Sequence, residues 1–231
     1  MKSTTYGSLW DGPILAKKEG MNLLTVFAGH ISPAPLDLAA MLGPAAWARL
    51  PAAVRRRFAA GHAATAFAGR MDLRCSRLGR FMAWLAWPLC SPLVADCLDD
   101  VPAEVVVQPD SEGGVIWSRR MGGRTVRSVK QAHPDGGVLE RTAGGLAMAL
   151  DVLEDDGCLV FQSRHYAWCW GPVYLRLPQA LSPGVCRVEH RDLGGNQFRF
   201  SLAMTHPWWG ETFHQTGVFD DRHEEAAHVA D

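Results

Sequence analysis

The feature that most constrains this chain is a long series of short apolar-alternating segments that runs from Glu104 to Phe219. Glycine-rich turns separate these segments, at Gly122–Gly123, Asp156–Gly157 and residues 194–196, and no helical period appears between them. Strands joined in this way pair as an antiparallel meander, which hides its edges by closing on itself or by packing on a second sheet. The sequence predicts a mostly β protein of the α+β class, with about ten strands forming a barrel or half-barrel.

The individual strands follow from a period of two in apolar character. An earlier segment with the same alternation, Thr65–Cys75, adds a strand ahead of the series. The other predicted strands are Ala103–Gln108, Gly114–Met121, Arg124–Gln131, Val138–Thr142, Leu146–Leu153, Cys158–Trp168, Val185–Asp192, Gln197–Thr205 and Thr212–Phe219.

Helical periodicity is confined to the first part of the chain. The apolar positions 36, 38, 41 and 42 form a stripe that Gly43–Pro44 interrupts, and a second helix containing Trp47 follows. A third helical segment covers residues 51–61, with Val54 and Phe58 on one face and Gly61 as its cap. The consecutive arginines at positions 55, 56 and 57 point in three directions, so we expect them to be solvated.

An apolar segment at residues 81–95 contains no charge but is shorter than the roughly 20 residues that span a bilayer. Pro88 and Pro92 also interrupt it. The sequence predicts a helix at Arg77–Leu89 that packs over the sheet. The alternative is an interfacial helix that places Trp84 and Trp87 at a lipid surface, with the arginines at positions 74, 77 and 80 beside the headgroups.

Composition sets the domain organisation and excludes some partners. The chain has 231 residues, 48% of them hydrophobic, which suits one domain at residues 34–219 between a flexible leader, 1–33, and a disordered tail, 220–231. A net charge of −1 argues against a nucleic-acid partner. Six cysteines without a CxxC pair and an N-terminus without a secretory apolar region predict reduced thiols and a cytoplasmic location.

Several sequence strings together resemble one bacterial family. They are LGPAAWARLPAAVRRRF, FAGRMDLR, DVPAEVVV, IWSRRMGGRTVRS, GCLVFQSRHYAW and FRFSLAMTHPWWGETFHQTGVF, and they cover roughly residues 41–220. This order is similar to the domain-of-unknown-function family four-one-six-six. The resemblance implies a β-rich fold and, because members also occur fused behind reductase-like or membrane modules, a peripheral-membrane or reductase partner. It implies no catalytic residue.

Three histidines fall on strand positions whose parity points them into the predicted barrel: His165, His190 and His206. No HxH or HxxxH spacing connects them, so we predict no metal site and no cofactor. An imidazole in a partly apolar pocket titrates near neutral pH and suits general acid–base chemistry. Our preferred catalytic residues are His165 with its neighbour Tyr166, and then His190, although ordinary hydrogen-bonded histidines at strand ends remain the alternative.

Two further groups are candidates for substrate binding. The arginines at positions 119, 124 and 127, with Glu140 and Arg141 on the next strand, could bind a carboxylate or phosphate of a substrate, although a ladder of outward ion pairs is the favoured interpretation. Trp117 and Arg119 share a strand face with apolar residues and are the better candidates for a cavity. An aromatic cluster near strand ends offers stacking surfaces for a flat or lipophilic ligand, or simply plugs the barrel. Its members are Trp168, Trp170, Tyr174, Trp208 and Trp209; of these we select Trp168, Trp170 and Trp208 as substrate-binding residues, together with His206.

The motifs of serine hydrolases, P-loop enzymes, dinucleotide-binding enzymes and zincins are absent from the sequence. The hypothesis that remains is a barrel that binds a lipophilic or polyketide-like small molecule, and that acts, if it is an enzyme, as a cofactor-independent isomerase or cyclase. The alternative is a non-catalytic binding or assembly module that associates with a partner protein or a membrane surface. Neither the substrate nor the oligomeric state follows from the sequence.

Overall fold

The computed structural model describes residues 24–26, 35–59, 64–171 and 173–221. Ten strands form most of the molecule: β2 (Thr65–Cys75), β3 (Leu98–Pro109), β4 (Val115–Met121), β5 (Arg124–Ala132), β6 (Val138–Arg141), β7 (Leu146–Asp155), β8 (Cys158–Trp170), β10 (Val185–Gly194), β11 (Gln197–His206) and β12 (Gly210–Asp220). Two short strands, β1 (Leu24–Val26) and β9 (Val173–Arg176), extend the sheet beside β8.

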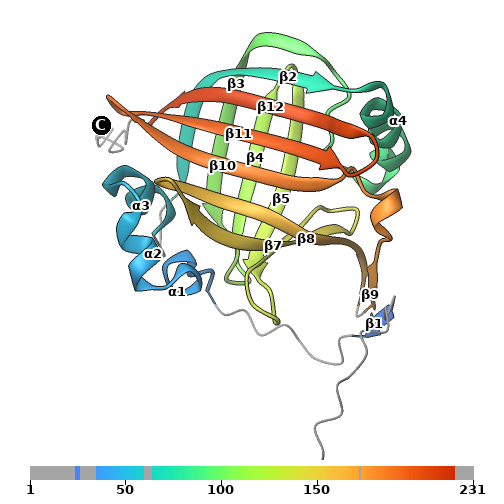
Figure 1. The fold of residues 1–231 in the computed structure, drawn as a ribbon, viewed down its shortest axis with the longest axis horizontal. Helices are drawn as coiled ribbons and strands as arrows, with labels where there is room; N and C mark the ends of the chain where they lie inside the picture. The colour runs from blue at the N-terminus through green and yellow to red at the C-terminus, as the bar shows by residue number, and fades with distance from the viewer. Residues whose placement is uncertain (1–23, 27–34, 60–63, 172, 222–231) are drawn as a thin grey trace, which may run out of the picture.

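These ten strands close into an antiparallel barrel, as the sequence predicted (Figure 1). Going round the ring, the order is β8, β10, β11, β12, β2, β3, β4, β5, β6 and β7, and β7 pairs again with β8. The predicted glycine turns are confirmed: Gly122, Gly123, Gly157 and Gly195 all have positive φ, which the tight hairpins require.

Three short helices lie at one end of the barrel: α1 (Leu38–Leu42), α2 (Pro44–Arg49) and α3 (Ala52–Phe58) (Figure 1). Asp37 caps α1, its side chain accepting a hydrogen bond from the Ala40 amide at 2.9 Å, and Gly43 with φ of 77° separates α1 from α2. Leu38, Val54 and Phe58 pack against the barrel residues Leu150, Leu159 and Phe161. The three predicted helices therefore exist, while the predicted cap Gly61 lies outside the described residues.

The helix α4 (Arg77–Ala86) follows β2 and packs on the first residues of β12, away from α1, α2 and α3 (Figure 1). The 3₁₀ turn η1 (Trp87–Leu89) follows α4. Ser76 caps α4 by accepting a hydrogen bond from the Gly79 amide at 3.1 Å. A Cβ at Gly79 would lie 2.3 Å from the Thr212 carbonyl oxygen, and one at Gly144 would lie 2.0 Å from the Leu89 carbonyl oxygen. Glycine at these positions thus lets α4 pack closely on β12 and lets η1 pack on the β6–β7 turn. Among the helices of the described ranges, none is long and apolar enough to cross a bilayer.

Two predictions from the sequence need correction: the solvation of Arg57 and the start of the C-terminal tail. Arg57 is not solvated: its Nη2 donates to Asp221 Oδ2 at 2.5 Å, and both side chains are buried. The tail was predicted from residue 220, but Asp220 ends β12 and Asp221 forms this ion pair. The rest of the predicted tail and most of the predicted leader lie outside the described residues.

A bulge in β8 changes which side chains point into the barrel. Ala149 of β7 pairs with His165, and the next residue, Leu150, pairs with Ser163, so Arg164 is an extra residue without a partner. Parity reverses at this point. Phe161 and Ser163 face inward before the bulge, whereas Tyr166 faces inward after it and His165 faces outward.

Candidate functional site

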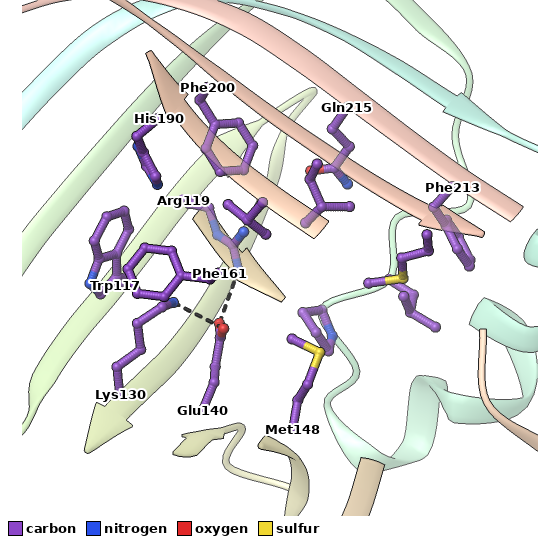
Figure 2. A pocket seen from close by; sticks show the side chains of 15 residues that line it. Trp117, Arg119, Lys130, Glu140, Met148, Phe161, His190, Phe200, Phe213 and Gln215 are labelled. Carbon is purple, nitrogen blue, oxygen red and sulfur yellow. Dashed lines mark ion pairs between the residues drawn. The ribbon is translucent and has the colours of Figure 1, made fainter. Parts of the chain in front are cut away.

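A cluster of three charged side chains lies inside the barrel on adjacent strands: Arg119 from β4, Lys130 from β5 and Glu140 from β6 (Figure 2). Lys130 Nζ is 3.0 Å from Glu140 Oε2, and Arg119 Nη2 is 3.6 Å from Glu140 Oε1. The Ser128 hydroxyl donates a hydrogen bond to Glu140 Oε1 at 2.6 Å. All three charged residues are buried, and none of them exposes more than 9% of its surface.

The strand register explains this arrangement. Lys130 and Glu140 are direct cross-strand partners in the β5–β6 pair, so their side chains leave the sheet on the same face. Ser128 lies two residues before Lys130 and shares that face. The indole of Trp117 also points inward, and Lys130 Nζ is 4.7 Å from the centre of its ring, within cation–π distance.

The charges in this cluster do not balance, because two cations face one carboxylate. Burial alone would raise the pKa of Glu140, but Lys130 and Arg119 lower it to about 2. Burial lowers the pKa of Lys130, an effect that Glu140 opposes. Glu140 is therefore ionised at neutral pH, and the site carries up to one positive charge that no other carboxylate of the described residues neutralises.

Two buried nitrogen atoms near the cluster have no hydrogen-bond partner in the described part of the chain: Arg119 Nε and His190 Nδ1. The His190 ring lies among aromatic side chains, 4.8 Å from the Phe58 ring centre and 5.7 Å from that of Trp117. Burial lowers the pKa of His190 well below its usual value, and the neighbouring Arg57, Lys130 and Arg119 lower it further. His190 is thus neutral, and its predicted inward orientation is confirmed.

The space around these groups consists of two adjacent regions. A cavity of about 40 Å³ lies in the barrel interior, with room for a few water molecules or the polar group of a ligand. A larger pocket of about 250 Å³, which we call the mouth pocket, opens between α1, α3 and the β3–β4 turn. Trp117, Lys130 and Phe161 line both regions, so the mouth pocket and the interior cavity adjoin at these three side chains.

At the end of the interior cavity away from Trp117 and Lys130, Figure 2 shows Met148 and Phe213. Pro92 and Leu93, from the segment that follows η1, and Met204 also line the cavity. This end is apolar, whereas the charged groups gather toward the mouth pocket. A ligand would therefore meet the charges first if it came through the mouth pocket.

His165, the preferred catalytic residue from the sequence, lies outside the barrel wall, and its predicted inward orientation is wrong. Its Nε2 is 2.8 Å from the Tyr174 hydroxyl, and its ring is 6.4 Å from that of His133. Burial, with help from Arg176 and His133, lowers its pKa to about 4. Tyr166 points inward, but its hydroxyl donates to the Gly184 carbonyl. As neighbours on one strand the two side chains point to opposite sides of the wall, and the bulge at Arg164 makes Tyr166, instead of His165, the inward one.

The other predicted substrate-binding residues divide into two groups. Trp117 and Arg119 line the cavity as expected. His206 is buried at the end of β11, where it stacks on Trp209 with ring centres 4.0 Å apart, and it is absent from the cavity lining. The remaining tryptophans also lie away from the lining: Trp168 donates to the Gly144 carbonyl, while Trp170 and Trp208 are 73% and 71% exposed.

The arginines around the Gly122–Gly123 turn behave differently from Arg119. Arg124 pairs with Asp96 at 2.7 Å, Arg120 pairs with Glu104 at 3.4 Å, and Arg127 is exposed on the outer face. They belong to the outward set that the sequence favoured. Within the described ranges, no group of three or more side chains is arranged to hold a metal ion.

Sequence reasoning did not single out Lys130, and it favoured an outward ion pair for Glu140, which is buried inside the barrel. The β5 sequence RTVRSVKQA has polar and apolar residues at both parities, so alternation does not decide which face is buried. A lysine and a glutamate are also rarely buried unless they are paired, and their pairing follows from a register that the sequence does not reveal.

Comparison with known proteins supports the family resemblance. The family model described as Domain of unknown function (DUF4166) matches residues 50–219, which include α3 and the whole barrel ring up to Phe219. No curated protein and no solved structure matches the chain.

Proposed function

The chain belongs to the DUF4166 family, and the description of that family assigns no activity. We propose that the protein binds a small lipophilic carboxylate. The observation that carries this proposal is the excess positive charge of the cluster formed by Arg119, Lys130 and Glu140. A buried charge without a counterion is costly, and an anion bound there would remove that cost. Arg119 Nε, which lacks a partner among the described residues, offers a donor for the same anion.

The mouth pocket supports the lipophilic part of the proposal. It is lined mainly by apolar side chains, among them Leu36, Leu38, Phe58 and Val107. Its volume of about 250 Å³ is just below the usual range of ligand sites, about 300–1,000 Å³, so a small ligand suits it. We infer that the apolar body of the ligand occupies the mouth pocket, while its carboxylate passes between Trp117 and Phe161 to reach Lys130.

The test compares octanoate with 1-octanol by isothermal titration calorimetry. The two probes have the same chain length but only octanoate carries a charge, so the wild-type protein should bind octanoate at least tenfold more tightly. Lys130→Met should remove most of this preference. Arg127→Met is the matched control, because it removes a cation from the outer face of the same strand and should leave both affinities unchanged.

Equal affinity for octanoate and octanol would contradict the proposal, as would the absence of measurable octanoate binding. A preference for octanoate that survives Lys130→Met but disappears in Arg127→Met would place the anion on the outside of the barrel. Thermal unfolding of each variant shows whether a lost affinity reflects a lost fold.

A second candidate function, proton transfer in an isomerisation or cyclisation, is favoured by His190. Its Nδ1 is buried without a hydrogen-bond partner in the described structure, and its ring lines the interior cavity with Arg119. A carboxylate bound between Arg119 and Lys130 would offset the cations that lower the pKa of His190 and would raise that pKa toward neutrality. His190 would then remove a proton next to a carbonyl group of the ligand, and Arg119 would stabilise the enolate oxygen.

This candidate is tested with 3-oxooctanoate in D₂O, by following deuterium exchange at C2 with NMR. Wild-type protein should accelerate the exchange, and His190→Gln should reduce the acceleration by about a hundredfold or more. His165→Ala serves as the control, because that ring lies outside the wall. Exchange that depends on His165 and not on His190 would refute this assignment, while binding of octanoate without any exchange would leave a binding protein.

A further inference from the structure

The outer face of α4 and η1 carries an unusual number of exposed apolar side chains. Phe81, Trp84, Leu85 and Trp87 are 56%, 70%, 63% and 72% exposed. They lie within seven consecutive residues, and we call this group the α4 face. Side chains of this size rarely gather on a surface unless it contacts something else.

The helix geometry shows that the α4 face includes positive charge. Gly79 and Ala83, four residues apart, form the side of α4 that is buried against the barrel. Arg77 and Arg80 lie on the exposed side with Phe81 and Trp84. No acidic residue occurs from Arg77 to Leu89, and across the described ranges neither arginine forms an ion pair.

The nearby carboxylates along the chain have other partners. Asp72, five residues before Arg77, accepts a hydrogen bond from the Asp100 amide at 2.8 Å. Asp96 pairs with Arg124 at 2.7 Å, and Asp99 and Asp100 pair with Arg74 and Arg70 respectively. The α4 face therefore combines apolar rings with two cations that the surrounding surface does not neutralise. The chemistry that complements it is a surface with negative charges above an apolar layer.

We propose that the α4 face docks on an anionic lipid bilayer. A helix of ten residues is too short to span a bilayer, but it can lie in the interface plane with its aromatic and aliphatic side chains among the upper acyl carbons. Tryptophan favours this depth, and the arginines reach the lipid phosphates. The close contacts at Gly79 and Gly144 hold α4 and η1 in place on the barrel, so the face needs no rearrangement before it binds.

The experiment is co-sedimentation of the full chain with vesicles of phosphatidylcholine alone or with 30% phosphatidylglycerol. Binding should be at least tenfold stronger to the anionic vesicles and should weaken as salt increases. Trp84→Gln with Trp87→Gln should reduce binding about tenfold or more. Arg77→Gln with Arg80→Gln should abolish the difference between the two vesicle compositions.

Leu153→Gln is the matched control, because Leu153 is 40% exposed on the β7 end near α2 and should have no effect. Binding that is equally strong in the Trp84/Trp87 variant would overturn the proposal, as would the absence of vesicle binding. A wild-type dimer that this variant converts to monomer, without vesicle binding, would show instead that the face joins two protein chains.

Docking of the α4 face on a bilayer does not depend on the proposed ligand in the barrel. The variants distinguish the failure of one proposal from the failure of the other. Lys130→Met should leave vesicle binding intact, whereas the Trp84/Trp87 variant should leave octanoate binding intact.

Discussion

The barrel contains two buried ion clusters, and their difference indicates what each is for. Arg57 and Asp221 form a balanced pair, 2.5 Å apart, that joins α3 to the residue after β12. Arg119, Lys130 and Glu140 form an unbalanced group in which one carboxylate serves two cations. A balanced pair needs no further ion and holds parts of the fold together, whereas an unbalanced group is completed by a ligand.

The two clusters also differ in how they tolerate the loss of their carboxylate. Arg57 cannot release its proton, so it stays charged whatever its surroundings. Lys130 can become neutral, since burial already lowers its pKa. Arg119 also keeps its charge, but it lies 3.6 Å from Glu140, whereas Arg57 lies 2.5 Å from Asp221. We therefore expect the balanced pair to be the more sensitive of the two.

The largest effect is expected for Asp221→Asn. This change leaves the Arg57 guanidinium buried without a counterion and should lower the free energy of unfolding by about 3–5 kcal/mol. Urea denaturation measures it. Combining Asp221→Asn with Arg57→Met should cost less than the single change, because no charge is then left behind. A double variant that is less stable than Asp221→Asn would contradict this account.

Glu140→Gln should have a smaller effect, about 2–3 kcal/mol, because the charge-assisted contacts of the carboxylate with Lys130, Arg119 and Ser128 are lost while Lys130 can release its proton. The effect should also depend on pH. The pKa of Glu140 is about 2 in the folded protein and about 4.3 in the unfolded chain, so its stabilisation is complete above about pH 4.3 and is lost as the pH falls toward 2. The difference in urea stability between wild type and Glu140→Gln should shrink over this window; a difference that stays constant would refute the assignment.

Binding of octanoate should be accompanied by proton uptake. The bound carboxylate adds negative charge beside Lys130 and raises the pKa that burial had lowered. The number of protons taken up is measured by calorimetry in buffers that differ in ionisation enthalpy, and it should be larger at pH 9 than at pH 6. Lys130→Met should abolish it, and uptake that persists in this variant would point to His190.

The smallest effect is expected for His165→Phe, because the side chain of His165 lies outside the barrel wall. Its pKa of about 4 is below the usual 6.5, so the stability that its neutral form contributes is complete above about pH 6.5 and is lost as the pH falls toward 4. The variant should lack this pH dependence, change stability by less than about 1 kcal/mol at pH 7 and bind octanoate as the wild type does. A loss of octanoate binding would return His165 to the candidate site.

The fold was largely predictable because alternation and glycine turns are local signals. β2 was predicted at its observed bounds, and the inward direction of Trp117, Arg119 and His190 followed from parity. β9, which follows the Gly171 turn, was missed although β6, also of four residues, was predicted. The direction of His165 was wrong because an unpaired residue at 164 reverses parity, and no local pattern marks that bulge.

The way the ring closes has a consequence for synthesis of the chain. β2, the first strand of the ring, pairs on one side with β3 and on the other with β12, through contacts such as Gly69 with Phe219 and Cys75 with Phe213. While the ribosome is still producing the middle of the protein, one edge of β2 has unpaired backbone N–H and C=O groups, because its partner β12 is the last strand to be made. A chain released before β12 would keep two open edges, so a nonsense mutation near position 210 should yield aggregated protein in place of a slightly shortened barrel.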